Sequence, residues 1–160
     1  MRSTFRRAME FRSAMIGRWS GEGAGWYPTI ADFDFHETVE VADLGRPFLT
    51  YRQMTKASDG SPLHTEVGYL RFVGERQAEL VVAQPTGISE VLTGWIEDRA
   101  AGYRLALDST QVGHTPTSKP VAATRRIFLL EGDVLDVEFW MEAVGQPMQQ
   151  HLRSRLRRDP

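Results

Sequence analysis

The chain contains no cysteine among its 160 residues. Without cysteine there are no disulfides, thiolate nucleophiles, iron–sulfur clusters or cysteine-based zinc sites. The chain also lacks any apolar run near the roughly 20 residues that cross a bilayer. Residues 1–19 have neither the apolar core nor the small-residue cleavage site of a secretion signal. We therefore expect a cytoplasmic protein that has no membrane partner.

The sequence also has little net charge, because 19 Lys and Arg residues face 21 Asp and Glu residues, giving −2 at pH 7. No broad basic surface is expected, so nucleic acid is not a predicted partner. The hydrolase motif G-x-S-x-G and the zinc-protease motif H-E-x-x-H are both absent. An enzyme with this sequence would need a cofactor to carry its reaction. The length predicts one domain, residues 1–160, with residues 1–13 as an N-terminal extension.

Strand-like segments follow one another along most of the chain. Each is rich in β-branched and aromatic residues, and turn signals such as "ASDGSP" and "VGER" separate them. The segments are residues 36–41, 47–55, 64–73, 77–84, 88–97, 103–112, 121–130, 134–143 and 148–156. With "GWYPTI" (25–30) and a short helix from about Thr4 to Ile16, this pattern predicts an all-β antiparallel up-and-down barrel of about ten strands. Its own side chains do not fill such a barrel, so a ligand cavity is expected.

The stretch "GRWSGEGAGWYPTI" (17–30) superficially matches a phosphate-binding loop. However, Gly21, Gly23 and Gly25 lack the dinucleotide-loop spacing, and no Lys-Ser/Thr pair follows as in a P-loop. Alternate glycines instead leave one face of a strand bare, so that backbone or an aromatic ring can approach closely. The bulky residues of this stretch are expected to plug one end of the barrel: Trp19, Trp26 and Tyr27.

Histidines are the candidate metal ligands of a chain without cysteine. The four are His36, His64, His114 and His151. Their spacing does not form a zinc site. His36 and His114 adjoin turn-like sequence and are expected at the surface. From the residues alone, His151 is either a metal ligand or a partly buried histidine bonded to a neighbour.

His151 belongs to the last predicted strand. Regular alternation would place Gln149, His151 and Arg153 on one face of that strand, and Leu152 and Ser154 on the other.

Several motifs occur in an order that resembles the nitrobindin family, whose members are haem-binding barrels related in shape to fatty-acid-binding proteins and lipocalins. The resemblance covers the chain from about Ala14 to Leu156. Its first motif is Gly17-x-Trp19-x-Gly21-x-Gly23, followed by Tyr27-Pro28-Thr29-Ile30. The later motifs are "GRPFLTY" (45–51), "LHTEVGYLR" (63–71), "AQPTGISEVLTG" (83–94) and "QPMQQHL" (146–152).

The resemblance implies a haem b cofactor, one per subunit, with His151 as the proximal iron ligand and catalytic residue. It further implies that Thr29 contacts the haem and that Lys119 lies near a haem propionate, where an ammonium group would pair with it. His64 is expected near the pocket, in either a distal hydrogen-bonding role or a structural one. The other pocket-lining residues implied by the motifs are Leu63, Gln84 and Met148.

The family's activity is the isomerisation of peroxynitrite to nitrate at a ferric haem, together with binding of nitric oxide. The resemblance therefore implies an enzyme with small-molecule ligands, in a family where homodimers occur. Two alternatives stay open: an iron-free carrier of a fatty acid or another apolar ligand, and a nitric oxide carrier or sensor without turnover.

Overall fold

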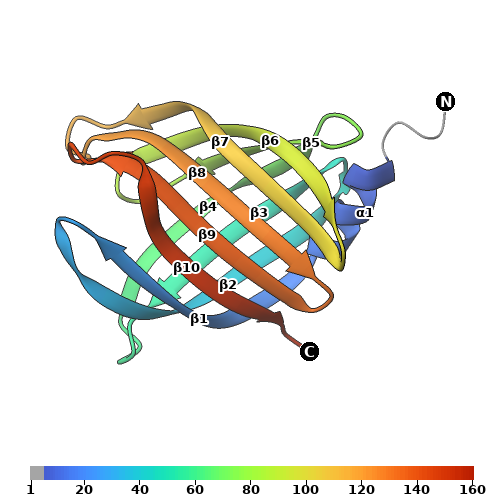
Figure 1. The fold of residues 1–160 in the computed structure, drawn as a ribbon, viewed down its shortest axis with the longest axis horizontal. Helices are drawn as coiled ribbons and strands as arrows, with labels where there is room; N and C mark the ends of the chain where they lie inside the picture. Colours follow the sequence, from blue (N-terminus) through green and yellow to red (C-terminus); the bar gives the residue numbers. More distant parts are fainter. Residues whose placement is uncertain (1–5) are drawn as a thin grey trace.

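The structure is a computed structural model that describes residues 6–160. Thr4 and Phe5, where the predicted helix begins, lie outside the described residues. Ten strands close into one antiparallel barrel, in which sequence neighbours pair and β1 also pairs with β10 (Figure 1). The strands are β1 Gly17–Tyr27, β2 Ile30–Arg46, β3 Phe48–Lys56, β4 Pro62–Phe72, β5 Gln77–Ala83, β6 Ile88–Arg99, β7 Gly102–His114, β8 Val121–Glu131, β9 Val134–Ala143 and β10 Gln149–Arg158. The predicted up-and-down barrel is confirmed.

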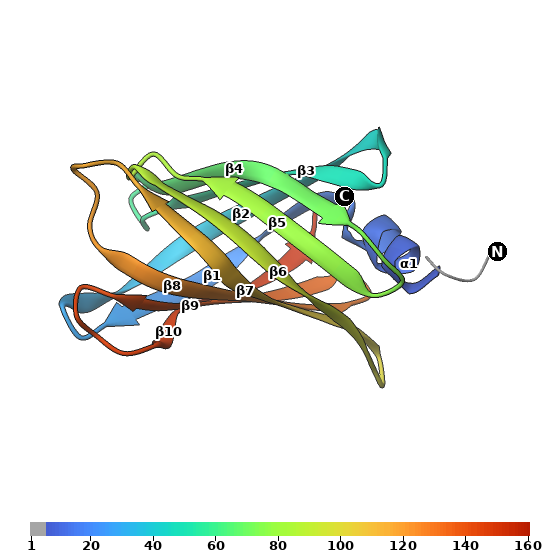
Figure 2. The ribbon, with the colours of Figure 1, turned by 90° about the horizontal axis from the view of Figure 1, so that it is seen from above.

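Helix α1, Arg6–Met15, lies across one end of the barrel (Figure 2). Its apolar side chains Ala8, Phe11 and Met15 are fully buried. The ring of Phe11 packs edge-to-face on Tyr103, with 5.9 Å between the ring centroids. By this packing α1 closes one barrel end and leaves the opposite end for a ligand.

Within residues 6–160, no helix is long and apolar enough to cross a membrane.

Strand β1 forms the seam at which the barrel closes onto β10, and its glycines make that contact possible. A Cβ atom on Gly21 would lie 2.0 Å from the carbonyl oxygen of Arg155 on β10. A Cβ atom on Gly23 would lie 2.4 Å from the ring of Phe35 on β2. The expected close approach of backbone and of an aromatic ring to these glycines is confirmed.

The aromatic residues of β1 do not all plug one end, and this expectation is corrected. Trp19 is buried beneath α1, where its Nε1 donates a hydrogen bond to the Met15 carbonyl over 3.0 Å. Tyr27 lies at the other end of the same strand, where its ring contacts His151 with 5.3 Å between centroids. Trp26 beside it is only half-buried. The cause is that β1 runs the length of the barrel, so residues eight positions apart reach opposite ends.

Strand β2 begins six residues earlier than its predicted start at residue 36. The exposed Asp32 and Asp34 are poor strand formers and hid this part of the strand. Phe33 lies between them and Phe35 follows them, and both of these side chains line the cavity in the barrel interior.

The barrel interior has two layers. Next to α1 it is a packed apolar core that includes Val39, Leu70 and Phe128. Nearer the open end of the barrel, the inward positions of β2, β4 and β8 carry charged side chains instead. This layering places a polar region between the packed core and the open end.

Candidate functional site

A cavity of about 700 Å³ opens at the barrel end opposite α1. Its volume falls within the range of small-molecule binding sites. The loops and strand ends at this end of the barrel supply its outer residues: Thr29, Leu63, Thr86, Thr117, Lys119 and Val144. Lys119 is exposed there, so its ammonium group can meet an anionic group of a ligand at the opening.

Aromatic side chains surround His151 on the cavity wall. Its ring stands roughly edge-on to Tyr27, Phe33 and Phe139, at centroid distances of 5.3, 6.2 and 6.2 Å. These contacts fix the plane of the imidazole and keep that side of the cavity apolar. A flat, largely apolar ligand fits beside such a wall.

His151 is the extra residue of a β-bulge in β10. Gln150 pairs with Trp140 and Leu152 with Phe139, so two successive residues of β9 span three residues of β10. As a result His151, Leu152 and Ser154 all line the cavity. The prediction that His151 faces away from Leu152 and Ser154 was wrong, because the bulge breaks the regular alternation.

The orientation of His151 follows from one hydrogen bond. Its Nδ1 lies 2.8 Å from the carbonyl oxygen of Trp26, and a carbonyl only accepts, so Nδ1 carries the hydrogen. Burial lowers the pKa of His151, against the opposing effect of that hydrogen bond. The neutral ring therefore keeps a lone pair on Nε2, as an iron ligand requires.

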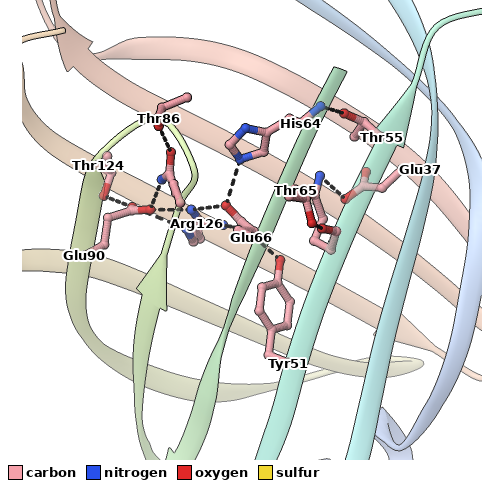
Figure 3. Close-up of polar contacts among 12 residues, drawn as sticks. Glu37, Tyr51, Thr55, His64, Thr65, Glu66, Thr86, Glu90, Thr124 and Arg126 are labelled. Atoms are coloured by element: carbon pink, nitrogen blue, oxygen red, sulfur yellow. Dashed lines mark hydrogen bonds and ion pairs between the residues drawn. The ribbon is translucent and has the colours of Figure 1, made fainter. Parts of the chain in front are cut away.

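A buried polar cluster lies on the inner wall between this apolar region and the packed core (Figure 3). Its members come from five strands and each is at most 8% exposed: Glu37, Tyr51, Gln53, Glu66, Glu90, Thr124 and Arg126. Arg126 is central, since it forms ion pairs with both Glu66 and Glu90. Its guanidinium also lies 4.8 Å from the centroid of the Phe139 ring, which in turn contacts His151. The cluster thus packs against the aromatic wall.

The carboxyl groups of this cluster titrate differently. Burial alone would raise the pKa of Glu66, but the adjacent Arg126, together with the hydrogen bond from His64, outweighs it and lowers that pKa to about 2. Burial raises the pKa of Glu37 to about 6, because its hydrogen bonds to Ser154 and Gln53 offset only part of the loss of hydration. Glu66 is therefore ionised at neutral pH, while Glu37 changes charge near pH 6.

The structure brings together most of the residues singled out in the sequence. Those lining the cavity are Thr29, Leu63, His64, Gln84, Lys119 and His151. Met148 is 36% exposed and is not among the lining residues. His36 and His114 are exposed, as expected. Gly17, Trp19, Gly21 and Gly23 belong to β1 and shape the barrel rather than the cavity.

Sequence reasoning missed the buried polar cluster. A signal was present, because strand alternation places Arg126 on the same face as Phe128 and Leu130, and Glu90 on the same face as Leu92. Charged residues at positions that continue an apolar inner face mark an internal site.

The residue set fits a haem better than a bare metal ion. Within residues 6–160, no three His, Asp or Glu side chains are grouped so as to hold a metal. A single neutral histidine on an apolar wall, with a lysine at the opening, instead suits an iron whose other in-plane ligands come from a porphyrin. The site and the fold define the class of haem-binding β-barrels.

The comparison with known families agrees. A family model described as "THAP4-like, heme-binding beta-barrel domain" matches residues 9–158. The chain belongs to this haem-binding family, the nitrobindins, as its motifs predict.

Individual relatives are similar over nearly the whole chain. A protein of Nocardia farcinica named peroxynitrite isomerase is 47% identical over 91% of this chain and 87% of its own length. Peroxynitrite isomerase 2 of Mycobacterium ulcerans is 46% identical over 90% of both chains. The crystal structure of Rv2717c from Mycobacterium tuberculosis superposes with a TM-score of 0.92, at 42% identity, covering 98% of this chain and 99% of that one.

Proposed function

We propose that the chain binds one haem b per subunit through His151 and isomerises peroxynitrite to nitrate. The observation that carries the proposal is the 2.8 Å contact from His151 Nδ1 to the Trp26 carbonyl, which leaves Nε2 as the free ring nitrogen in an apolar cavity. The relatives named peroxynitrite isomerase support the same reaction.

The haem supplies the ferric iron at which peroxynitrite reacts. The chain supplies the surroundings. The Trp26 carbonyl and the aromatic wall hold the His151 ring in one orientation, and the apolar side chains limit water around it. We assign Lys119, at the opening, to a haem propionate, and Thr29 to contact with the haem edge.

His64 is the second histidine of the cavity. It lies on β4, four strands from β10 in one direction around the barrel and six in the other, and so on the opposite side from His151. We assign it to the ligand side of the haem. Leu63 and Gln84 complete this side of the cavity.

Titration of the purified chain with haemin tests the axial ligand. We expect a Soret band at one haem per chain, and loss of the wild-type spectrum in His151→Ala. His36→Ala is the matched control, since His36 is exposed and lies outside the cavity lining. Equal haem spectra for wild type and His151→Ala would overturn the assignment.

Stopped-flow decay of peroxynitrite tests turnover. We expect faster decay and a higher nitrate yield with the haem-loaded chain than with free haemin or the haem-free chain. Binding of nitric oxide to the haem-loaded chain, without faster peroxynitrite decay, would identify a carrier or sensor instead. Uptake of a fatty acid in preference to haemin would identify a carrier of apolar ligands.

The residues to which we assign roles all line a cavity of one chain, so the proposal requires neither a monomer nor a homodimer. Sedimentation of the haem-loaded protein decides between the two. The cytoplasmic location expected from the sequence stays a prediction, which cell fractionation tests.

A further inference from the structure

His64 is held at two points beside the cavity. Its backbone N–H donates to Thr55 Oγ1 over 3.1 Å, and its ring Nε2 lies 3.3 Å from Glu66 Oε2 (Figure 3). The ring is 28% exposed, whereas the Glu66 side chain is 4% exposed. The partly accessible histidine thus rests on a buried carboxylate.

Glu66 is itself fixed on both oxygens. Its Oε1 accepts from the Tyr51 hydroxyl over 3.0 Å and from Arg126 Nη1. Its Oε2 accepts from Arg126 Nη2 over 3.0 Å. A carboxylate with this many donors is ionised and can only accept hydrogen bonds. The ring nitrogen that faces it, His64 Nε2, must therefore carry a hydrogen.

Among the described residues, His64 Nδ1 has no hydrogen-bond partner, so it is the ring nitrogen left for a ligand. We propose that Glu66 is a positioning residue that holds His64 as its Nε2–H form and leaves Nδ1 to the bound ligand. The statement that this ligand is bound to a haem rests on the proposed function. The assignment of the ring hydrogen to His64 Nε2 does not depend on that function.

The proposal has a consequence for ligand choice. In the neutral Nε2–H form, Nδ1 accepts a hydrogen bond and donates none. His64 would then favour a ligand that brings its own hydrogen, such as peroxynitrous acid or water, over a bare anion. When the ring is protonated, Nδ1 donates and the preference reverses.

Glu66→Gln separates this role from simple packing. Arg126 donates to both oxygens of Glu66 and the Tyr51 hydroxyl can donate or accept, so the amide of the variant can face His64 with its oxygen or with its NH₂ group. The amide oxygen keeps the Nε2–H form, whereas the NH₂ group donates to Nε2 and moves the hydrogen of the neutral ring to Nδ1. We therefore expect both ring forms in this variant.

Glu90→Gln is the matched control. Glu90 is equally buried and also pairs with Arg126, but its hydrogen-bond partners do not include His64. Both variants remove one carboxylate charge from Arg126. Only Glu66→Gln changes the group that faces the ring, so a general effect of lost charge would appear in both.

The test is long-range ¹⁵N–¹H NMR of the histidine rings in the full-length, haem-free chain, at a pH where His64 is neutral. We expect Nε2–H in wild type and in Glu90→Gln, and a mixture of Nε2–H and Nδ1–H in Glu66→Gln. A wild-type ring with its hydrogen on Nδ1 would overturn the proposal, as would a Glu66→Gln spectrum with no change. If Glu66→Gln does not fold, Glu66→Asp withdraws the carboxylate by one methylene, and we expect a mixture of both ring forms.

A second readout uses the haem-loaded protein with azide as an anionic probe. Because its ring can present Nδ1–H to the ligand, Glu66→Gln is expected to bind azide more tightly than wild type, by up to about tenfold, the upper limit that one hydrogen bond supplies. Glu90→Gln should keep the wild-type affinity. Failure to bind haem would count against the proposed function alone, because the NMR result does not depend on haem.

Discussion

Replacement of Arg126 by methionine tests whether one guanidinium holds the buried polar cluster together. Methionine keeps most of the length of the side chain but leaves Glu66 and Glu90 buried without their cation. Against the opposing effect of burial, Arg126 and to a smaller extent His64 lower the pKa of Glu66 to about 2 from 4.5, a net difference equivalent to about 3 kcal/mol. Loss of one partner of a buried ion pair gives a similar figure of about 3–5 kcal/mol. We expect Arg126→Met to lose about 3 kcal/mol of unfolding free energy at pH 7.

Urea unfolding, followed by tryptophan fluorescence, measures this loss. Arg125→Met is the control, because Arg125 is the neighbouring residue and forms an exposed ion pair with Asp108 at 2.6 Å. Exposed pairs of this kind contribute less than about 1 kcal/mol. Equal losses in the two variants, or a loss below about 1 kcal/mol in Arg126→Met, would refute the reasoning.

The pH dependence gives a second check on the same variant. In wild type the folded-state pKa of Glu66 is depressed, so its contribution is present above about pH 4.5 and is lost as the pH falls toward 2. In Arg126→Met the unpaired carboxyls bind protons more readily when folded, which stabilises the variant at acidic pH. The deficit should therefore shrink from pH 7 toward about pH 4, and a constant deficit would contradict this account.

Three further predictions concern single side chains. Burial raises the pKa of Glu37 to about 6 from 4.5, so wild type loses unfolding free energy as the pH rises through this window. Glu37→Gln has no such loss, and its unfolding free energy relative to wild type should therefore rise by about 2 kcal/mol between about pH 4 and pH 7.5 in urea unfolding. In Gly21→Ala the new Cβ would clash with the Arg155 carbonyl oxygen, so the variant should lose about 1–3 kcal/mol of unfolding free energy in urea or fail to fold. In Gly74→Ala the nearest atom would be 3.7 Å from the new Cβ, so this variant should unfold like wild type. Tyr27→Phe removes a hydroxyl bonded to β9 and should lose about 1 kcal/mol by the same measurement.

Sequence reasoning predicted the barrel well because strands and turns have local signals. Alternating apolar residues and short polar turns gave eight strands, β3 to β10, with nearly their observed limits, whereas β2 was predicted as residues 36–41 and spans Ile30–Arg46. The site depended on longer-range information. His151 was selected through the family motifs, since no pattern within β10 separates it from a structural histidine.

The bulge at His151 shows why the rest was not predictable. Alternation assumes that each residue of β10 has one partner on β9, and only the three-dimensional pairing reveals the extra residue. The hydrogen bond that orients the ring joins His151 to Trp26, 125 residues away in the chain. Sequence gives no signal for such a contact between two distant strands.

The buried polar cluster also bears on the alternative of a fatty-acid carrier. The inner wall of the cavity carries Glu37, Glu66 and Arg126, so a long acyl chain entering from the opening would meet charged groups before the packed core. Covering those groups with hydrocarbon removes their remaining hydration without supplying hydrogen bonds, which is unfavourable. A flat ligand bound near His151 avoids this penalty, because it can use the aromatic wall and leave the polar side chains to water or to small ligands. The distribution of charge inside the barrel therefore favours haem over a fatty acid, independently of the family to which the chain belongs.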